Sequence, residues 1–175
     1  SVKRGVYRLS ARTTEAFEAT RKNVAKFINA KTEDEIEFTR GTTESINLVA
    51  WSYGRKFFEA GDEILISGLE HHANIVSWQL VAEMKGAKIK VIPVLDNGDL
   101  DLAALPGLLN ARTKMVAVAH VSNSVGTVNP IAEIIATVRA AAPLAKVLIA
   151  AAQSSSHIKI GVQKLDCDFL AFSGH

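Results

Sequence analysis

The sequence has few of the features that mark membrane-embedded or disulfide-bonded proteins. Its 175 residues include one cysteine, Cys167, so no intramolecular disulfide and no cysteine-based metal cluster can form within it. The longest apolar runs, residues 115–119 and 147–152, are far shorter than the roughly 20 residues that a membrane-spanning helix needs. We therefore expect a soluble, cytoplasmic protein with no metal site and no membrane contact.

An excess of charge of one sign is missing as well. The 20 Lys+Arg and 18 Asp+Glu residues give a net charge of +2, which does not favour a nucleic-acid partner. With 48% hydrophobic and 22% charged residues, the composition excludes intrinsic disorder, and the length suits one domain or a large part of one. Because the chain opens at Ser1 and stops at His175 just after an apolar stretch, we expect a piece of a longer protein, truncated at both ends.

Helical and strand patterns alternate along the chain. Apolar residues recur with helical spacing in the segments 13–29, 42–57, 74–85, 102–109 and 130–142. Short apolar runs predict six strands, at residues 36–39, 64–66, 88–93, 115–120, 146–150 and 169–172. This alternation predicts an α/β fold with a mostly parallel sheet flanked by helices on both faces. Ligands of such sheets bind at the carboxyl ends of the strands, so the loops that follow the strands are the candidate site.

The loop after the first predicted strand, residues 39–44 (TRGTTE), leads into a helix. Backbone N–H groups at a helix N-terminus, together with the hydroxyls of Thr42 and Thr43, would suit a phosphate group. The same residues also fit an ordinary helix cap, with Gly41 at the cap and Glu44 at the third helical position. Taken alone, this loop does not decide between the two.

The later loops are polar and equally ambiguous by themselves. His71 and His72 are adjacent and point in different directions, so they predict either a ring stacked on a flat ligand or ordinary loop histidines, not a shared metal. Residues 120–127 offer an amide and hydroxyls. Residues 153–157 contain Gln, Ser and His but no G-x-S-x-G nucleophile elbow, and residues 173–175 add a hydroxyl and an imidazole.

Two further features favour structural roles. Cys167 lies between two aspartates, which raise the pKa of a thiol, so we interpret it as a small core residue rather than a nucleophile. Arg4, Arg8 and Arg12 form a basic row at helical spacing, which indicates an exposed helix face or a subunit contact.

Together and in this order, the loops closely resemble one family. The matching segments are residues 39–47 (TRGTTESIN), 70–74 (EHHAN), 120–123 (HVSN), 152–153 (AQ) and 171–175 (AFSGH). They resemble the cysteine desulfurases, and within them the sulfur-mobilisation desulfurases and selenocysteine lyases, which are class V aminotransferase-like enzymes dependent on pyridoxal 5'-phosphate (PLP). The resemblance implies a fold-type I large domain. Residues 1–175 would be part of this cofactor-binding domain, without the small C-terminal domain.

The resemblance also implies roles for individual residues. The phosphate of PLP would be held by four of them, Thr42, Thr43, Ser173 and His175. His71 would stack on the pyridine ring and is the candidate catalytic residue for proton transfer. Asn123 would lie near the substrate, and Gln153 would bind the phenolic oxygen of the ring.

The implied reaction converts L-cysteine or L-selenocysteine to alanine, with L-cysteine sulfur passing to an enzyme cysteine as a persulfide. The resemblance further implies a homodimer and a sulfur-acceptor protein as partners. In the family, the lysine that binds PLP and the persulfide cysteine both lie after the position of His175, so we expect residues 1–175 alone to be inactive.

One departure bears on the chemistry. Ala150 stands where the family has an aspartate that pairs with the ring nitrogen. Two alternatives therefore remain open: another class V enzyme, such as an aminotransferase, epimerase or kynureninase-like lyase, or a non-catalytic homologue that keeps only the fold.

Overall fold

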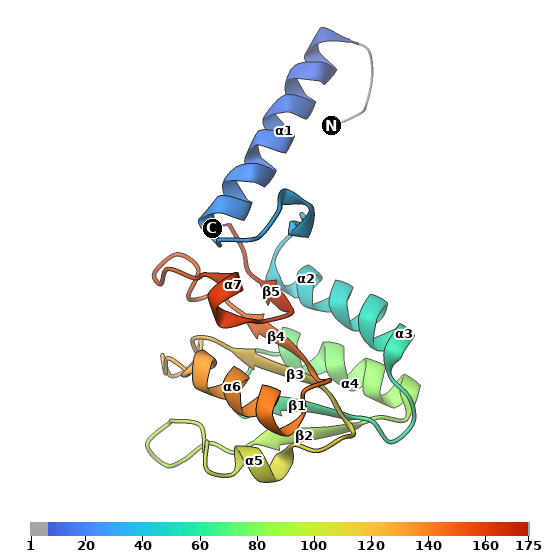
Figure 1. Ribbon diagram of the computed structural model, residues 1–175, viewed down its shortest axis with the longest axis vertical. Helices are drawn as coiled ribbons and strands as arrows, with labels where there is room; N and C mark the ends of the chain where they lie inside the picture. Colours follow the sequence, from blue (N-terminus) through green and yellow to red (C-terminus); the bar gives the residue numbers. More distant parts are fainter. Residues whose placement is uncertain (1–6, 175) are drawn as a thin grey trace. The chain divides into compact units, whose positions relative to one another are not determined.

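The computed structural model describes residues 7–174 (Figure 1). The chain divides into two compact units. One unit consists of residues 1–38 and 159–164, and the other of residues 39–158 and 165–175. All the loops that were singled out in the sequence belong to the second unit.

The first unit contains the helix α1 (Arg8–Phe27) and the short 3₁₀-helix η1 (Glu33–Glu35). The guanidinium carbon of Arg21 lies 5.4 Å from the ring centroid of Phe17 and 5.2 Å from that of Phe38. Arg21 also donates a hydrogen bond to the backbone carbonyl of Ile36. This cation–π and hydrogen-bond contact fixes the segment after η1 against α1.

Several predictions for this unit need correction. The strand predicted at residues 36–39 is wrong, because the carbonyl of Ile36 is bound by the Arg21 side chain and the segment joins no sheet in the part that the structure describes. The predicted helix begins earlier, at Arg8. Phe27, one of the apolar residues in the predicted helical pattern, is 58% exposed. In the predicted basic row, Arg8 and Arg12 are exposed, and Arg4 lies outside the described residues.

The second unit is built on one five-stranded sheet in which every pairing is parallel. Its strands are β1 (Glu63–Ser67), β2 (Lys88–Ile92), β3 (Thr113–Ala119), β4 (Lys146–Ala150) and β5 (Phe169–Ala171). The spatial order is β2-β1-β3-β4-β5. The predicted α/β class and parallel sheet are confirmed.

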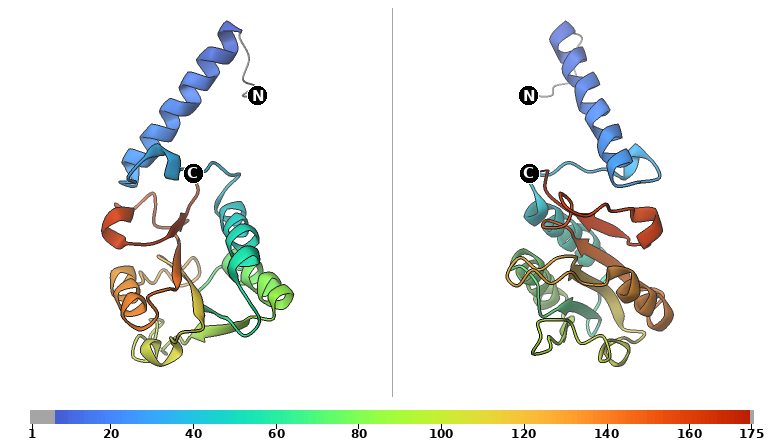
Figure 2. Two further views of the ribbon diagram at one scale, coloured as in Figure 1. Left: turned by 45° about the vertical axis from the view of Figure 1, so that its right-hand side comes forward. Right: turned by 90° about the vertical axis from the view of Figure 1, so that its left-hand side faces the viewer.

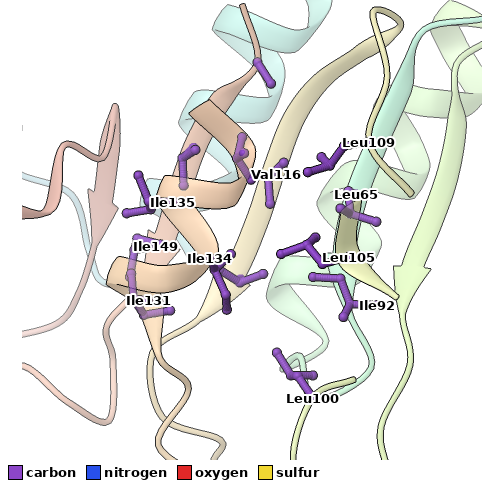
Figure 3. Packing of buried hydrophobic residues seen from close by; sticks show 14 of the residues in the cluster. Leu65, Ile92, Leu100, Leu105, Leu109, Val116, Ile131, Ile134, Ile135 and Ile149 are labelled. Atoms are coloured by element: carbon purple, nitrogen blue, oxygen red, sulfur yellow. The ribbon is translucent and has the colours of Figure 1, made fainter. Parts of the chain in front are cut away.

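Helices cover both faces of this sheet (Figure 2). They are α2 (Thr42–Val49), α3 (Arg55–Phe57), α4 (Ala73–Lys85), α5 (Leu105–Leu108) and α6 (Ile131–Ala141). The short helix α7 (Val162–Leu165) falls mostly within the first unit. Alternate residues of β3 point to opposite faces. Met115 and Ala117 pack with α2 and α4, whereas Val116 and Val118 pack with α6 in the cluster of Figure 3.

The segment predicted as one helix over residues 42–57 is helical throughout but contains a π-helical turn, η2 (Ala50–Gly54), between α2 and α3. A Cβ atom on Gly54 would lie 3.0 Å from Cγ1 of Val81 on α4. Gly54 therefore permits the close approach of α4 at this turn.

Other helix ends follow their local sequence signals. Gly86, with φ of 67°, ends α4 in the left-handed conformation that glycine adopts without strain. The helix predicted at residues 102–109 is reduced to Leu105–Leu108. No helix within residues 7–174 is long and apolar enough to cross a membrane.

Candidate functional site

A cavity of about 750 Å³ lies at the carboxyl ends of the strands, beside the N-terminus of α2. Its volume is within the range of small-molecule and cofactor sites. The walls include all six of the predicted site residues that the structure describes, Thr42, Thr43, His71, Asn123, Gln153 and Ser173. The seventh, His175, lies outside the described residues. In the sheet, β1 lies between β2 and β3. From β1 the chain continues to β2 on one side, whereas β3 lies on the other side, so the position between β1 and β3 is the switch point of this topology, where a ligand crevice is expected.

One end of the cavity is formed by the start of α2 and by Ser173, which follows β5. The backbone N–H of Thr42 donates to Oγ of Ser173 at 3.0 Å, and the two hydroxyl oxygens are 2.8 Å apart. Gly41 has a φ of 150°, and a Cβ atom there would lie 3.3 Å from Oγ of Ser173. The first-turn N–H groups of a helix have no intrahelical acceptors, and the helix dipole favours negative charge at this end.

The loop before α2 is braced by its own side chains. Thr39 Oγ1 donates to the carbonyl of Gly41 at 3.1 Å and lies 2.7 Å from Oγ of Ser45. Glu44, predicted at the third helical position of a capping box, accepts the N–H of Arg40 at 2.5 Å rather than that of Gly41. Gly41 is thus the N-cap of α2, as the cap interpretation predicted, and it provides no side-chain cap hydrogen bond. The cap and the anion-binding interpretations are compatible, because neither excludes the other at this helix end.

His71 lies at the mouth of the cavity and is exposed. Its Nδ1 accepts the backbone N–H of Ala73 at 3.1 Å, so the neutral ring carries its proton on Nε2. The rings of His71 and His72 are nearly perpendicular, at 88°. The prediction that the two imidazoles point in different directions is confirmed, and residues 7–174 contain no cluster of three metal-ligating side chains.

Glu70 is a wall residue that the sequence reasoning did not single out. Its Oε1 accepts the backbone N–H of Ala119 at 2.7 Å and the hydroxyl of Ser67, and its Oε2 accepts Nδ2 of Asn74 at 2.7 Å. Burial raises the pKa of Glu70, and these three hydrogen bonds oppose the rise. Asn74 in turn accepts the indole N–H of Trp78 at 2.9 Å. The i, i+4, i+8 spacing of Glu70, Asn74 and Trp78 was the sequence signal from which their contacts could have been predicted.

The loop after β3 presents Asn123 at the cavity. An isolated antiparallel bridge joins Val121 to Val128, and the N–H of Ser122 donates to the carbonyl of Thr127 at 2.9 Å. Ser122 is buried, whereas Asn123 is exposed at the tip. The loop therefore holds the Asn123 amide out toward the cavity.

His120, at the base of that loop, has a different environment. Its Nδ1 is buried without a protein partner, as is Oδ1 of Asn129, and burial lowers the pKa of His120. The backbone N–H of His120 donates to the carbonyl of Ala150 at 2.9 Å, which continues the sheet ladder toward β4. His120 is not a wall residue of the cavity.

The end of β4 contributes an apolar part of the wall. Ala150 and Ala152 line the cavity, and Gln153 brings an exposed amide to it. Ala151 is fully buried, and its N–H donates to the carbonyl of Ala171 at 2.8 Å. No charge is present at Ala150, where the resemblance would require a carboxylate.

Cys167 is not at the cavity. It is half-buried against the α5–α6 core, and burial, with the neighbouring Asp168 and Asp166, raises the pKa of its thiol to about 11. A thiol with such a pKa is protonated at neutral pH, so the interpretation of Cys167 as an unreactive structural residue is supported.

The parallel sheet with helices on both faces, and a ligand-sized cavity at a helix N-terminus, define an α/β protein with a candidate ligand site at the carboxyl ends of its strands. All 175 residues match the family model of the class-V aminotransferases, and the chain belongs to this family.

Relatives within the family agree in name. The chain is 55% identical over its full length to a cysteine desulfurase of Dickeya dadantii, and it spans 42% of that relative's length. Its fold matches the crystal structure of the cysteine desulfurase CsdA from Escherichia coli with a TM-score of 0.88 and 39% identity, over 100% of this chain and 43% of that one.

A third match carries a ligand. A mutant of C-DES with glycine covalently linked to its PLP cofactor has a TM-score of 0.84 and 29% identity, over 97% of this chain and 44% of that one. The curated desulfurase of Dickeya dadantii is more than twice as long as the chain, which spans 42% of it.

The residues present fit PLP at two places. The hydroxyls of Thr42 and Ser173 and the start of α2 supply donors for a phosphate, and the absence of a Cβ atom at Gly41 lets the Ser173 hydroxyl lie close to the start of α2. The His71 imidazole at the cavity mouth offers a flat face for a ring. Only Ala150 departs from what the cofactor's ring nitrogen would require.

Proposed function

We propose that the chain forms the PLP-binding core of a cysteine desulfurase. The observation that carries this proposal is the single cavity wall shared by Thr42, Thr43, His71, Asn123, Gln153 and Ser173, which come from five separate loops. Relatives that are about half identical to this chain over its whole length are named cysteine desulfurases, which supports the same activity. The substrate is L-cysteine or L-selenocysteine, and the products are alanine and, from L-cysteine, an enzyme persulfide.

In this proposal the start of α2 is the phosphate site. Thr42, Thr43 and Ser173 donate to the phosphate oxygens, and His175 adds a further donor. The positive end of the helix dipole contributes roughly 0.3–1 kcal/mol for each favourable charge at an exposed site. PLP, when bound, withdraws electrons from the bond to the substrate's α-hydrogen.

His71 covers one face of the ring and is the proposed catalytic residue. Its Nδ1 is held by the Ala73 N–H, which orients the imidazole and leaves Nε2 free to carry a proton. Asn123 orients the substrate, and Gln153 donates its amide to the phenolic oxygen of the ring. Both amides are exposed and therefore available to a ligand.

Ala150 favours a second candidate function. The cavity wall carries no carboxylate at the end of β4, so a homologue that binds PLP but has lost most of its activity is consistent with this residue. Another class V reaction, such as that of an aminotransferase, epimerase or kynureninase-like lyase, is the remaining alternative within the family.

The wider assignment is part of the same proposal. Residues 1–175 form part of the large, cofactor-binding domain of a cytoplasmic homodimer that passes sulfur to an acceptor protein. By itself this stretch is inactive, since the lysine that binds PLP and the cysteine that receives sulfur are supplied by later parts of the protein.

The test uses the complete protein that contains this chain. Purified protein is mixed with PLP, the visible absorbance band is recorded, and borohydride reduction fixes the bound cofactor. Alanine and sulfide released from L-cysteine are then measured with a thiol reductant present. PLP binding with alanine release supports a desulfurase, binding without release supports the non-catalytic homologue, and no binding refutes both.

A further inference from the structure

Glu70 bridges a gap between two neighbouring strands. The last paired residues of β1 and β3 are Ile66 and Ala117, and beyond them the strands no longer pair. The N–H of Ala119, which points toward β1, is bound instead by Oε1 of Glu70 at 2.7 Å. The Glu70 carboxylate thus replaces a strand carbonyl at the point where the sheet opens into the cavity.

The hydrogen bonds behind Glu70 have a fixed direction. The indole N–H of Trp78 can only donate, so the side-chain oxygen of Asn74 faces it and the Asn74 NH₂ faces Oε2 of Glu70. Trp78 and Asn74 are both fully buried, which prevents water from substituting for either partner. The hydrogen-bond chain from Trp78 through Asn74 to Glu70 therefore requires a hydrogen-bond acceptor at the position of Oε2.

We propose that Glu70 is a positioning residue for the cavity. It fixes the gap between the ends of β1 and β3, and it thereby places His71, the next residue in the chain, opposite the 120–123 loop that carries Asn123. Its effect on ligand binding rests on the proposed PLP function, whereas the hydrogen-bond chain itself does not.

A different role would follow if the carboxylate acted on the ligand directly. Glu70 lines the cavity, so its charge could contact a bound molecule. The two roles are separable, because positioning depends on the pattern of donors and acceptors whereas a direct role depends on the carboxylate being at this residue.

The experiment exchanges donor and acceptor along the chain. In Glu70→Gln, the new NH₂ faces the Asn74 NH₂, and Asn74 cannot rotate because of Trp78. In Asn74→Asp, two acceptors face each other. The double variant restores the pattern, since the new glutamine donates to the new aspartate, which still accepts from Trp78. The double variant also keeps the net charge of the wild type. Glu83→Gln, at an exposed position of α4, is the matched control for a lost carboxylate.

All variants are made in the complete protein, and PLP affinity and the circular dichroism of the bound cofactor are measured. Each single variant weakens PLP binding by about tenfold or more, in keeping with a buried donor or acceptor left unpaired. The double variant returns the affinity to within about threefold of the wild type and restores the dichroism band, and Glu83→Gln leaves both unchanged.

Failure of this proposal and failure of the PLP assignment give different results. If the wild type binds PLP and the double variant stays as weak as Glu70→Gln, the carboxylate acts directly and the positioning role is overturned. If the wild type does not bind PLP, the functional proposal fails, and the ring resonances of ¹³C-labelled His71 still test Glu70. Those resonances shift in both single variants and recover in the double variant if Glu70 positions His71; no recovery overturns the inference.

Discussion

The two ends of the sheet in the second unit use polar residues in opposite ways. At the amino ends of the strands, Glu63 accepts from Lys90 and from Asn110, each at 2.7 Å. Asp168 accepts from Lys146 at 2.8 Å and from Arg139 at 2.9 Å. At the carboxyl ends, His71, Asn123 and Gln153 are exposed around the cavity. One end has its charges paired within the protein, and the other presents polar groups to a ligand.

The pKa values follow this division. Although burial raises the pKa of Glu63 and Asp168, their hydrogen bonds to cations and to N–H groups outweigh it, and both pKa values lie below their usual range. At the cavity, burial raises the pKa of Glu70. Charges at the amino ends are stabilised in the folded state, whereas at the cavity burial disfavours them.

The largest effect is expected at Ala150. In the complete protein, Ala150→Asp places a carboxylate in the cavity wall, where it stabilises a protonated ring nitrogen and strengthens the electron withdrawal by PLP. Alanine release from L-cysteine rises by about a hundredfold or more, since a few pKa units of stabilisation act mainly in the transition state. Ala150→Asn is the isosteric control and gives no comparable rise. Equal rates of alanine release by the wild type and by Ala150→Asp would mean that another residue supplies the carboxylate or that none is needed.

At the opposite end, Asp168→Asn tests stability. The side chain is 17% exposed and accepts from Lys146, Arg139 and the N–H of Val147. Its loss lowers the free energy of unfolding by about 2–3 kcal/mol, because a partly buried charge network is broken. PLP affinity of the folded protein stays unchanged. Urea unfolding with parallel PLP titration checks both statements, and a large loss of affinity would remove the contrast between the two ends.

The same residue predicts a pH dependence with a definite sign. The pKa of Asp168 is lower in the folded than in the unfolded protein, so its contribution is fully present above the unfolded value near 4. It is lost as the pH falls through the lower folded value. The wild type therefore loses more stability than Asp168→Asn between about pH 5 and pH 2. Parallel curves for the two proteins would contradict this.

A smaller effect is expected at the proposed phosphate site. Ser173→Ala removes the hydroxyl that accepts a hydrogen bond from the Thr42 N–H and that is hydrogen-bonded to Oγ1 of Thr42. PLP affinity falls by about tenfold, and the free energy of unfolding changes by less than about 1 kcal/mol, since Ser173 is only partly buried. Ser173→Thr, which keeps the hydroxyl, tests whether space beside Gly41 also matters. If the free energy of unfolding falls by more than the free energy of PLP binding, the main role of Ser173 is to stabilise the fold.

The smallest effect is expected at Cys167. Its thiol pKa of about 11 predicts slow alkylation at pH 8 in the folded protein and fast alkylation once the chain is unfolded. Cys167→Ala leaves PLP affinity unchanged. Mass spectrometry of iodoacetamide-treated protein measures the labelling, and rapid labelling of the native state would show that this part of the core is open.

The parallel strands were predictable because their signal is local. Residues 146–150 form a short apolar run, and parallel strands place their carboxyl ends at one edge whatever the loop sequences are. That rule brought Thr42 and Ser173, 131 positions apart, to one site. Local signals failed where a distant partner decided the outcome, as for residues 36–39, whose Ile36 carbonyl binds Arg21 instead of a strand.

The role of Glu70 was hidden for the same reason. Its hydrogen bond from the Ala119 N–H joins residues 49 positions apart, and nothing near Glu70 in the sequence specifies that donor. The contact of Asn74 with Trp78, at helical spacing, was accessible from the sequence. The π-helical turn at Ala50–Gly54 was not, because it depends on the approach of α4 at Gly54.

The hydrogen bond between Thr42 and Ser173 also orders events during synthesis of the chain. Thr42 leaves the ribosome well before Ser173, and at roughly 5–20 residues per second the 131 positions that separate them correspond to about 7–26 seconds of synthesis. Until β5 has docked, the start of α2 has its helix dipole but no hydroxyl opposite it. The contact between the start of α2 and Ser173 therefore forms late in the synthesis of residues 42–173.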